Sequence, residues 1–567
     1  MGSMTTVTAT SSLEKDNCNN NNNNNSKNSN KSSSPTMHDG PADFETAIKA
    51  CGFGRFNILL LVAALPAVMA TVLETAVVSY ILPSAECDLS LDLLDKGVLN
   101  AITYAGMIVS AIGWGYLADN KGRRKLLILG FFLDVVCVIC GAISQSRTQL
   151  MIAKFFGGFV MCGPFAVLMT YLSEFHGNNF RSRIMMIIGV MFSMAAIMLP
   201  LLAIIVLPLD WNFDILNMNF VAWKMYLAIC GIPSLMSGIF FCFFPESPRF
   251  LITQGRNTEA LEAFKKMYAL NTGKPKDTYP IKELIKEIKQ KDDNADKVSV
   301  ATIEANMQDI CNEEKQETVV AANNNNVNDV TLMDKQPNTF KVLCSKEYMG
   351  LCFRVCLMQF FILLGQNTMR LWLPQMFASL NEYEQISSES TSMCTILEYS
   401  VNKTELVKNP VDECVVIITP SSYTNNIIVA CVGFVTYLVA GTLINALGNK
   451  RIQVIGLTAA GTCGIALYWS SSSLSTLIIT AMYSALGSMS ATSSIGTSVN
   501  LFPTSLRTMI VSLTMMIGRM GSILGNVLFP ILMSFGCIPP FVMVGVVMYL
   551  GCLLAAFLPS TNKVELK

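Results

Sequence analysis

The stretch 115-GYLADNKGRRK-125 decides the fold, because a related stretch, 441-GTLINALGNKR-451, recurs later in the chain. Gly, Leu, an Asp or Asn, Gly and two basic residues recur at the same relative positions. The shift in residue number that carries Gly115 onto Gly441 is called here the repeat shift. Each stretch follows a long apolar run and ends in positive charge, as is typical where a membrane helix reaches the cytoplasm. The repetition indicates a chain built from two related halves.

The repeat shift relates a second pair of segments. It carries the stretch 171-YLSEFHGNNFR-181 onto 497-TSVNLFPTSLR-507. Two separate motifs at one shift make coincidence a poor explanation, and duplicated halves with a binding site between them are a common plan of transporters. The corresponding residues are Glu174 with Asn500 and Arg181 with Arg507.

The composition is that of a membrane protein. Of the 567 residues, 52% are hydrophobic and only 14% are charged, against about 25% charged residues in a soluble domain. A helix needs roughly 20 mostly apolar residues to cross a bilayer. We therefore predict an all-α integral membrane protein with six spans in each of two halves. The spans are 56–83, 97–118, 126–145, 150–172, 184–207, 225–244, 349–376, 425–447, 452–470, 474–498, 509–533 and 539–559.

Lysines and arginines predict the orientation, because loops rich in these residues stay in the cytoplasm. They gather after the second, fourth, eighth and tenth spans, whereas the loops 84–95 and 534–538 have none. Both termini and the polar segment 252–347 then lie on the cytoplasmic side. The basic residues concerned are Lys121, Arg123, Arg124, Lys125, Arg181, Arg183, Lys450, Arg451 and Arg507.

Five segments follow from these spans. The first, 1–43, is polar and contains an asparagine run, so it cannot bury enough apolar area to fold. Apolar spacing predicts helices at 257–270 and 281–290 that pack beneath the bundle. The segments are a disordered cytoplasmic tail (1–43), an N-terminal six-helix half (44–251), a cytoplasmic central loop (252–347), a C-terminal six-helix half (348–560) and a cytoplasmic tail (561–567).

The largest outside loop, 377–423, contains two cysteines and a glycosylation sequon. An oxidising exterior would permit a disulfide between Cys394 and Cys414, and a sugar on Asn402 would report the topology. Two free thiols and an unused sequon are the alternative, because sequence does not settle connectivity.

Three ionisable residues lie deep inside predicted spans, where a charge costs at least about 2.5–3.5 kcal/mol and usually faces the protein interior. Glu74 lies nine residues before Pro83, about 14 Å below the outer end of its span, and Thr71 shares its face. Arg519 and Asp134 each lie midway along a span. We predict that Glu74 and Arg519 border a substrate cavity. There the glutamate binds a cationic substrate or carries a proton, and the arginine binds a carboxylate or neutralises Glu74. A buried structural pair is the alternative, and for Asp134 a structural hydrogen bond is favoured.

The seventh span adds uncharged groups in 365-GQNTMRLWLP-374. Gln366 and Asn367 offer hydrogen bonds, and Trp372 offers a flat apolar face. Such mixtures suit a small organic ligand. An interfacial aromatic anchor is the other interpretation of Trp372.

The loop motif has a physical logic. Gly115 and Gly122 permit close backbone approach and a tight turn. Asp119, at the cytoplasmic end of its helix, can accept hydrogen bonds from backbone donors or pair with an arginine.

Two arginines of the motif, Arg123 and Arg124, can pair with carboxylates such as Glu174. Such pairs could form and break as the halves move, and plain topogenic charge is the alternative. The second copy has Asn445 and Asn500 in place of acids, so its charge network is expected to be weaker.

These residues carry a family resemblance. The motif at 115–125 resembles the hallmark of the major facilitator superfamily, and 245-PESPRFL-251 resembles the segment that closes the first half in sugar and organic-ion transporters. Segments 65–91, 171–175 and 371–376 are similar to synaptic vesicle glycoprotein 2 and its relatives. The resemblance covers about 45–255 and 345–560.

The resemblance implies the major facilitator fold, a central cavity, alternating access and residence in a plasma or vesicle membrane. In the vesicle glycoproteins the outside loop is a large folded domain, and a pair of acids lies in the first span; here the loop is short and the pair becomes Thr71 and Glu74. The gating residues implied by the motifs are Gly115, Asp119, Gly122, Arg123, Arg124, Glu174, Arg181, Glu246, Arg249 and Arg507.

Two functions remain open. The first is secondary transport of a small organic solute by alternating access. The second is a non-transporting membrane protein that acts in vesicle trafficking through cytoplasmic partners. We predict no enzyme, cofactor or metal, because no nucleotide loop, metal cluster or nucleophile–base constellation is visible. Zero formal net charge indicates no nucleic-acid partner. We expect a monomer in the lipid bilayer of a plasma membrane or a secretory or synaptic vesicle, with both termini cytoplasmic.

Overall fold

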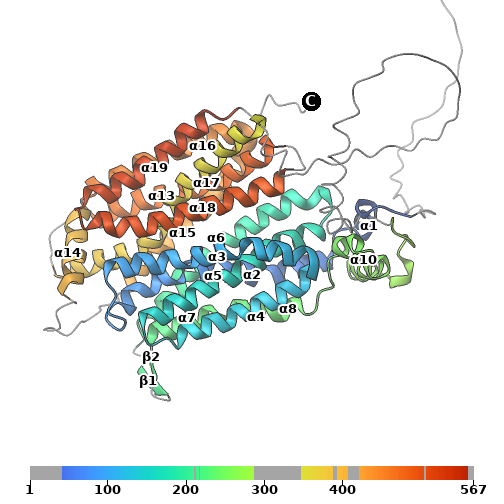
Figure 1. Ribbon diagram of the computed structural model, residues 1–567, viewed down its shortest axis with the longest axis horizontal. Coiled ribbons are helices and arrows are strands. Elements are labelled where there is room, and N and C mark those ends of the chain that lie inside the picture. Colours follow the sequence, from blue (N-terminus) through green and yellow to red (C-terminus); the bar gives the residue numbers. More distant parts are fainter. Residues whose placement is uncertain are drawn as a thin grey trace, which may run out of the picture.

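The computed structural model describes residues 41–209, 212–215, 218–285, 346–386, 392–406, 420–502 and 506–559. Within these ranges, twelve helices are long and apolar enough to cross a membrane, by length and composition. They coincide with the twelve predicted spans, so the predicted fold class is confirmed. Figure 1 shows the spans running side by side along the long axis of the molecule.

The N-terminal half contains six spans and several short helices. Its sixth span is divided at Gly231, and Pro233 lies in the first turn of the helix that follows, where the missing N–H of proline costs nothing. The spans are α2 (Arg55–Ala85), α3 (Leu93–Lys121), α4 (Arg123–Ala142), α5 (Arg147–Glu174), α6 (Asn178–Val206) and α7 with α8 (Ala222–Cys230 and Ile232–Phe241); the short helices are α1 (Phe44–Cys51), α9 (Pro248–Thr253), α10 (Asn257–Thr272) and η1 (Lys276–Thr278).

The C-terminal half contains the other six spans and a separate helix, α14 (Met393–Leu406), that packs against the end of the seventh span. Its spans are α13 (Lys346–Ile386), α15 (Pro420–Leu447), α16 (Asn449–Ala466) with the short η3 (Leu467–Trp469), α17 (Ser473–Leu501), α18 (Arg507–Met533) and α19 (Ile538–Ala556). Each half has its own hydrophobic core.

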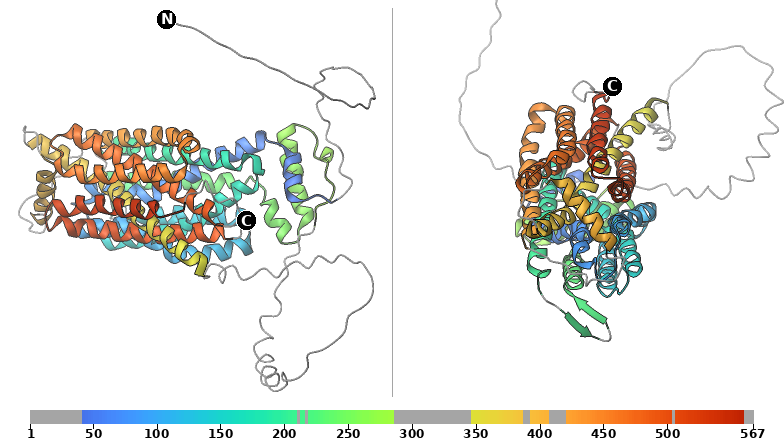
Figure 2. Two further views of the ribbon diagram at one scale, coloured as in Figure 1. Left: turned by 90° about the horizontal axis from the view of Figure 1, so that it is seen from above. Right: turned by 90° about the vertical axis from the view of Figure 1, so that its left-hand side faces the viewer.

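The two ends of the molecule differ. Helices α1 and α10 pack together at one end, called here the α10 end, and α14 lies at the opposite end, the α14 end (Figure 2). The loop motifs at 115–125 and 441–451 lie at the α10 end, which the distribution of lysine and arginine predicts to be cytoplasmic.

The sequence repeat is visible in the backbone. Gly122 separates α3 from α4 with φ 97° and ψ 151°, and Gly448 separates α15 from α16 with φ 79° and ψ 151°. This region of conformational space is essentially restricted to glycine. The helices α5 and α17 begin at matching residues, and each is capped by a serine, Ser146 or Ser472, that accepts from the backbone three residues on.

A matched basic residue also repeats. Arg124 donates through Nη2 to the carbonyl of Cys242 at 2.6 Å, just after the sixth span. Lys450, onto which the repeat shift carries Arg124, donates to the carbonyl of Leu558, just after the twelfth span. In both halves the loop motif therefore holds the end of the last helix.

Two local predictions differ from the structure. Helix α10 confirms the predicted helix at 257–270, but the described part of the second predicted helix, 281–285, is extended. Its backbone pairs with Ala42 instead, because Ala42 donates to the carbonyl of Glu283 and accepts from Ile285, both at 3.0 Å. A small hairpin, β1 (Asn212–Ile215) and β2 (Met218–Val221), was also not predicted.

The proposed disulfide is wrong in one partner. Cys394 on α14 is bonded to Cys537, at the start of α19, and Cys414 lies outside the described residues. The short turn after α18 brings Cys537 to the α14 end, where α14 packs against α13 and η3. Cys87, after α2, is also disulfide-bonded. Asn402 lies within α14, and its side chain is outside the described part of the structure.

Candidate functional site

A buried ion pair lies inside the N-terminal half. Nζ of Lys154 on α5 donates to Oε2 of Glu74 on α2 at 2.7 Å, and both side chains are 2% exposed. Removing one partner of such a pair leaves an uncompensated charge and costs about 3–5 kcal/mol. Lys154 therefore neutralises Glu74, a role that the sequence offered to Arg519.

A glycine makes room for the second carboxylate oxygen. Oε1 of Glu74 is buried and has no hydrogen-bond partner within the described residues. A Cβ at Gly157, one turn after Lys154, would lie 2.2 Å from this oxygen. Only glycine fits at this position without displacing the pair. The carboxylate is held through one oxygen, and the other packs against the backbone of Gly157.

Asp134 lies in the same half, on α4. Its Oδ2 accepts a hydrogen bond from the hydroxyl of Ser234 on α8 at 2.5 Å, and the residue is buried. This bond joins two helices that also pack through apolar side chains of the N-terminal core. The predicted structural hydrogen bond of Asp134 is therefore confirmed.

Thr71 uses its hydroxyl locally. Oγ1 donates to the carbonyl of Ala67 at 3.1 Å and lies 3.7 Å from the sulfur of Met161. Thr71 is buried one turn before Glu74 and shares its helix. Its contacts hold α2 against α5 beside the ion pair.

The two amides of the seventh span join helices of the C-terminal half. Nε2 of Gln366 donates to the carbonyl of Ser484 at 3.0 Å and to the hydroxyl of Ser488 at 2.7 Å, both on α17. Nδ2 of Asn367 donates to Ser522 on α18 at 2.7 Å. These bonds fix α13 against α17 and α18.

Trp372 is buried in the core of the C-terminal half, with its ring centroid 5.2 Å from that of Phe529. An interfacial anchor keeps its polar edge in the headgroup region. The anchor interpretation of Trp372 is therefore wrong, because the ring is 1% exposed.

Arg519 lies between the two halves. Its Nη1 donates to the sulfur of Cys162 on α5 at 3.2 Å, so that α18 reaches into the N-terminal half. The structure therefore does not bring Arg519 and Glu74 together as an ion pair. Glu74 is satisfied within one half, whereas Arg519 faces the other half.

The halves also meet at the α14 end. The hydroxyl of Tyr423 on α15 donates to the carbonyl of Tyr80 on α2 at 3.3 Å, and the two rings stack. On the neighbouring helix pair, a Cβ at Gly97 of α3 would lie 2.6 Å from the carbonyl oxygen of Asn526 and 2.7 Å from Cγ of Pro530, both on α18. The backbones of α3 and α18 are thus in direct contact at this end.

The loop motif at 115–125 packs against the segment that follows the sixth span, at the α10 end of the N-terminal half. Oε1 of Glu246 accepts from the backbone N–H of Arg124 at 2.9 Å, and a Cβ at Gly122 would lie 2.5 Å from its other oxygen. Nε of Arg123 lies 3.6 Å from Oε1 of Glu174, so the predicted pairing of these two is confirmed. The carboxylate group of Glu246 thus lies directly against the tight turn at Gly122.

The other predicted gating residues that the structure describes, Gly115, Arg249 and Arg507, make fewer or weaker contacts. A Cβ at Gly115 would meet nothing within 4 Å, so the predicted close approach is not found there. Arg249 stacks over the ring of Phe44 with 5.4 Å to the centroid, and Nε of Arg507 donates to the carbonyl of Phe502 at 3.2 Å. The side chains of Asp119, Arg181, Asn445 and Asn500 lie outside the described residues.

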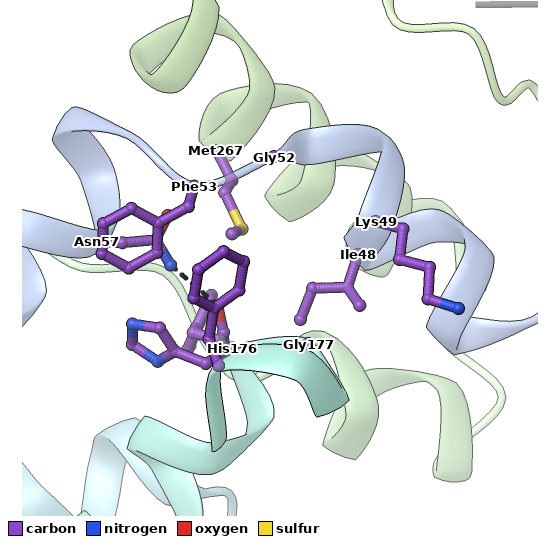
Figure 3. A pocket seen from close by; sticks show the side chains of 10 residues that line it. Ile48, Lys49, Gly52, Phe53, Asn57, His176, Gly177 and Met267 are labelled. Atoms are coloured by element: carbon purple, nitrogen blue, oxygen red, sulfur yellow. Dashed lines mark hydrogen bonds between the residues drawn. The ribbon is translucent and has the colours of Figure 1, made fainter. Parts of the chain in front are cut away.

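A separate cavity of about 180 Å³ opens at the α10 end (Figure 3). Its wall includes Phe53, Asn57 and His176, together with residues of α1 and α10. Nδ1 of His176 lies 2.6 Å from the carbonyl of Leu172, and burial lowers the pKa of His176 below its usual value. The imidazole is therefore neutral near pH 7 and supports the turn between α5 and α6.

Sequence reasoning missed the partner of Glu74. Lys154 stands alone in the apolar run 150–172, so the rule that selected Glu74 and Arg519 also applies to it. Cys537 was missed because the loop 534–538 was interpreted only by its lack of lysine and arginine. Both signals were present in the sequence.

Comparison with known proteins identifies the type of fold. A family model described as "Sugar (and other) transporter" matches residues 86–311. The xylose transporter XylE from E. coli, in a partially occluded inward open conformation, covers 89% of this chain and 100% of its own with a TM-score of 0.59 at 14% identity. Its inward open conformation covers 90% and 97% with a TM-score of 0.59 at 16% identity. At these identities the likeness shows the fold alone.

Curated relatives match a part of the chain. Synaptic vesicle glycoprotein 2B of Rattus norvegicus is 31% identical over 255 residues, 44% of this chain and 37% of the relative. Synaptic vesicle glycoprotein 2A of Homo sapiens is 29% identical over 255 residues, 44% of this chain and 34% of the relative. The match thus spans about a third of the length of these relatives.

Proposed function

We propose that this protein, which has the fold of the major facilitator superfamily and resembles the synaptic vesicle glycoproteins 2, is a secondary transporter of a small organic solute. The buried pair of Glu74 and Lys154 is the observation that carries the proposal. Ionisable residues inside a membrane bundle are costly and mark proton or solute pathways. A pair that lies wholly within one half suits a group that couples proton binding to movement of that half.

The coupling step follows from the geometry of the pair. Glu74 is bonded to Lys154 through Oε2 only, while Oε1 is unpartnered within the described residues. Addition of a proton to Glu74 removes the charge that holds the ammonium group of Lys154. The N-terminal half then carries an unbalanced positive charge, which favours exposure of the pair to water.

Alternating access is supported by the contacts at the α14 end. Gly97 lies against α18, and Tyr80 stacks on Tyr423, so the halves approach closely at that end. Opening there requires the backbone contact at Gly97 and the Tyr80–Tyr423 stack to separate; the ion pairs of the described residues at this end lie within the N-terminal half.

In this proposal the solute binds between the halves. Arg519 lines this boundary because it reaches α5, and Asn367 holds α13 to Ser522 of α18, the helix that carries Arg519. Thr71, Gln366 and Trp372 lie buried behind them and hold the helices in place. Glu74 serves as the coupling group and not as a direct ligand.

Uptake into liposomes tests the proposal. The purified full-length chain would be reconstituted and offered labelled cations, carboxylates and sugars, with and without a pH gradient. Glu74→Gln cannot take up or release a proton, so it should keep exchange of solute across the membrane and lose the response to the gradient. Glu259→Gln is the matched control, because that acid is exposed and pairs with Arg256 on the surface of α10. A variant Glu74→Gln that responds to the gradient as wild type does would refute the coupling role.

A second candidate function is favoured by one observation. Helix α1 and helix α10 form a folded platform at the α10 end, in which Phe44 packs on Phe264 with 5.9 Å between ring centroids. Such a platform suits cytoplasmic trafficking partners. Folded wild-type protein that moves no solute of any charge in the uptake assay would favour this second function.

A further inference from the structure

The C-terminal half carries two arginines deep inside its spans, and its spans have no acidic residue at the same depth. From residue 349 to 381, and again from 420 to 559, the sequence contains no Asp or Glu. Arg370 lies on α13 and Arg519 lies midway along α18. Positive groups at this depth in a bilayer normally have a counter-charge.

Both arginines lie on helices that border the N-terminal half. Arg519 donates to Cys162 of α5 at 3.2 Å. Leu371, the neighbour of Arg370, is fully buried in the core of the N-terminal half. Figure 1 shows the arrangement, with α18 between α13 and α3.

The acids of the N-terminal half do not supply the counter-charge. Glu74 is bonded to Lys154, and Asp134 is bonded to Ser234. In the described ranges of the chain, neither Arg370 nor Arg519 has a carboxylate within ion-pair distance. The boundary between the halves is therefore positively charged.

We propose that the transported solute is a small organic anion, whose carboxylate, sulfate or phosphate group is bound by Arg370 and Arg519. The inference rests on the proposed transport function for its site and adds the class of substrate. Guanidinium groups match planar or tetrahedral anions with two parallel hydrogen bonds. Asn367, one turn from Arg370, adds an amide close to the same place.

The spacing suits a small solute. The hydrogen bond between Asn367 and Ser522 places these two residues at about the same height along α13 and α18. Arg370 follows Asn367 by one turn, and Arg519 precedes Ser522 by one turn, so the two arginines are offset by about 9 Å along the helices. An offset of this size is within reach of two arginine side chains and suits a single anionic group with a short organic body.

Binding to the purified full-length protein tests the inference independently of transport. The probes are salicylate with its neutral analogue salicylamide, succinate, p-nitrophenyl sulfate, xylose and tyramine, and the readout is the thermal shift. At least one anion should stabilise the protein more than the neutral and cationic compounds do. Arg370→Gln and Arg519→Gln should each weaken the binding of that anion about tenfold or more. Arg354→Gln is the matched control on α13, because Arg354 bonds the backbone carbonyls of Gly350 and Phe557.

A second measurement uses the wild-type chain, in case the variants fold poorly. Phenylglyoxal modification, read by mass spectrometry, should be slowed at Arg370 and Arg519 by the stabilising anion and unchanged at Arg354. Stabilisation by xylose or tyramine only, by none of the compounds, or equally by salicylate and salicylamide would overturn the inference. Anion binding without uptake into liposomes would support the anion site and count against the transport function.

Discussion

A single glycine determines how the buried acid of the first span is held. Gly157 faces Oε1 of Glu74, and the carboxylate occupies the space where a side chain would begin. Packed interiors do not absorb an added methyl group without strain, which typically costs about 1–3 kcal/mol. The acid, the lysine and the glycine therefore act as one unit across two helices.

Gly157→Ala should lower the melting temperature and disturb the Glu74–Lys154 pair, because the new Cβ would lie 2.2 Å from Oε1. A thermal unfolding curve of the purified protein measures the effect. Gly113→Ala is the matched control within a span, since nothing lies within 4 Å of its Cβ position, and helix propensity predicts a gain of up to about 1 kcal/mol there. Equal melting temperatures for the two variants would contradict the packing.

At this scale the sequence revealed which residues are unusual and not which residues touch. Glu74, Arg519 and Asp134 stand out because charge inside an apolar run is costly. Their partners depend on how the helices pack in three dimensions, and Lys154 is distant from Glu74 in sequence. The buried position of Trp372 likewise depends on Phe529 of another helix.

At the scale of elements, the turn between neighbouring spans is built twice from the same geometry. Gly122 and Gly448 adopt nearly the same backbone angles, and the basic residue two positions later binds the end of the last helix in each half. In the N-terminal copy an acid, Glu246, also lies against the glycine. The C-terminal half has no Asp or Glu from residue 420 to 559 to play that part, so the N-terminal turn is the more tightly held of the two.

Gly122→Ala should destabilise the protein by more than the about 1–3 kcal/mol expected for backbone strain alone, because its Cβ would also meet Glu246 at 2.5 Å. Thermal unfolding again supplies the measurement. Gly52→Ala separates the two effects, since Gly52 has φ 65° and ψ −178°, in the same glycine-only region as Gly122, but nothing within 4 Å of its Cβ position. The same loss for both variants would show that contact with Glu246 contributes nothing.

The elements were predicted well where a pattern is local. Twelve apolar runs of membrane-spanning length give twelve helices in the described chain, because backbone groups in lipid must be satisfied within the segment. The prediction was wrong at 281–285, where the backbone pairs with Ala42 although the spacing of the apolar residues is that of a helix.

Three basic residues at the α14 end each pair with an acid, so their positive charge is balanced at that end. They are Lys96, Arg147 and Lys224.

At the scale of the whole molecule, two bundles with separate cores meet along a boundary that carries Arg370 and Arg519, neither with a carboxylate partner among the described residues. The duplication predicted this plan from two motifs at one shift, whereas the closeness of the halves at the α14 end could not be predicted. That contact depends on Gly97 lying against Asn526 and Pro530, which are remote in sequence. The boundary is the part of the molecule whose rearrangement transport requires.

The central claim is that the halves open at one end as they close at the other. Spin-label distances test it most directly, with labels carried by unnatural amino acids because the chain has 18 cysteines. One pair at Leu94 and Phe535 reports the α14 end, and one pair at Asn120 and Arg451 reports the α10 end.

Gly97→Val places a side chain where α3 and α18 touch. Compared with the same labelled protein that keeps Gly97, the label distance in this variant should be longer at the α14 end and shorter at the α10 end. If both distances stayed unchanged, or both changed in the same direction, the account of two alternating halves would be contradicted.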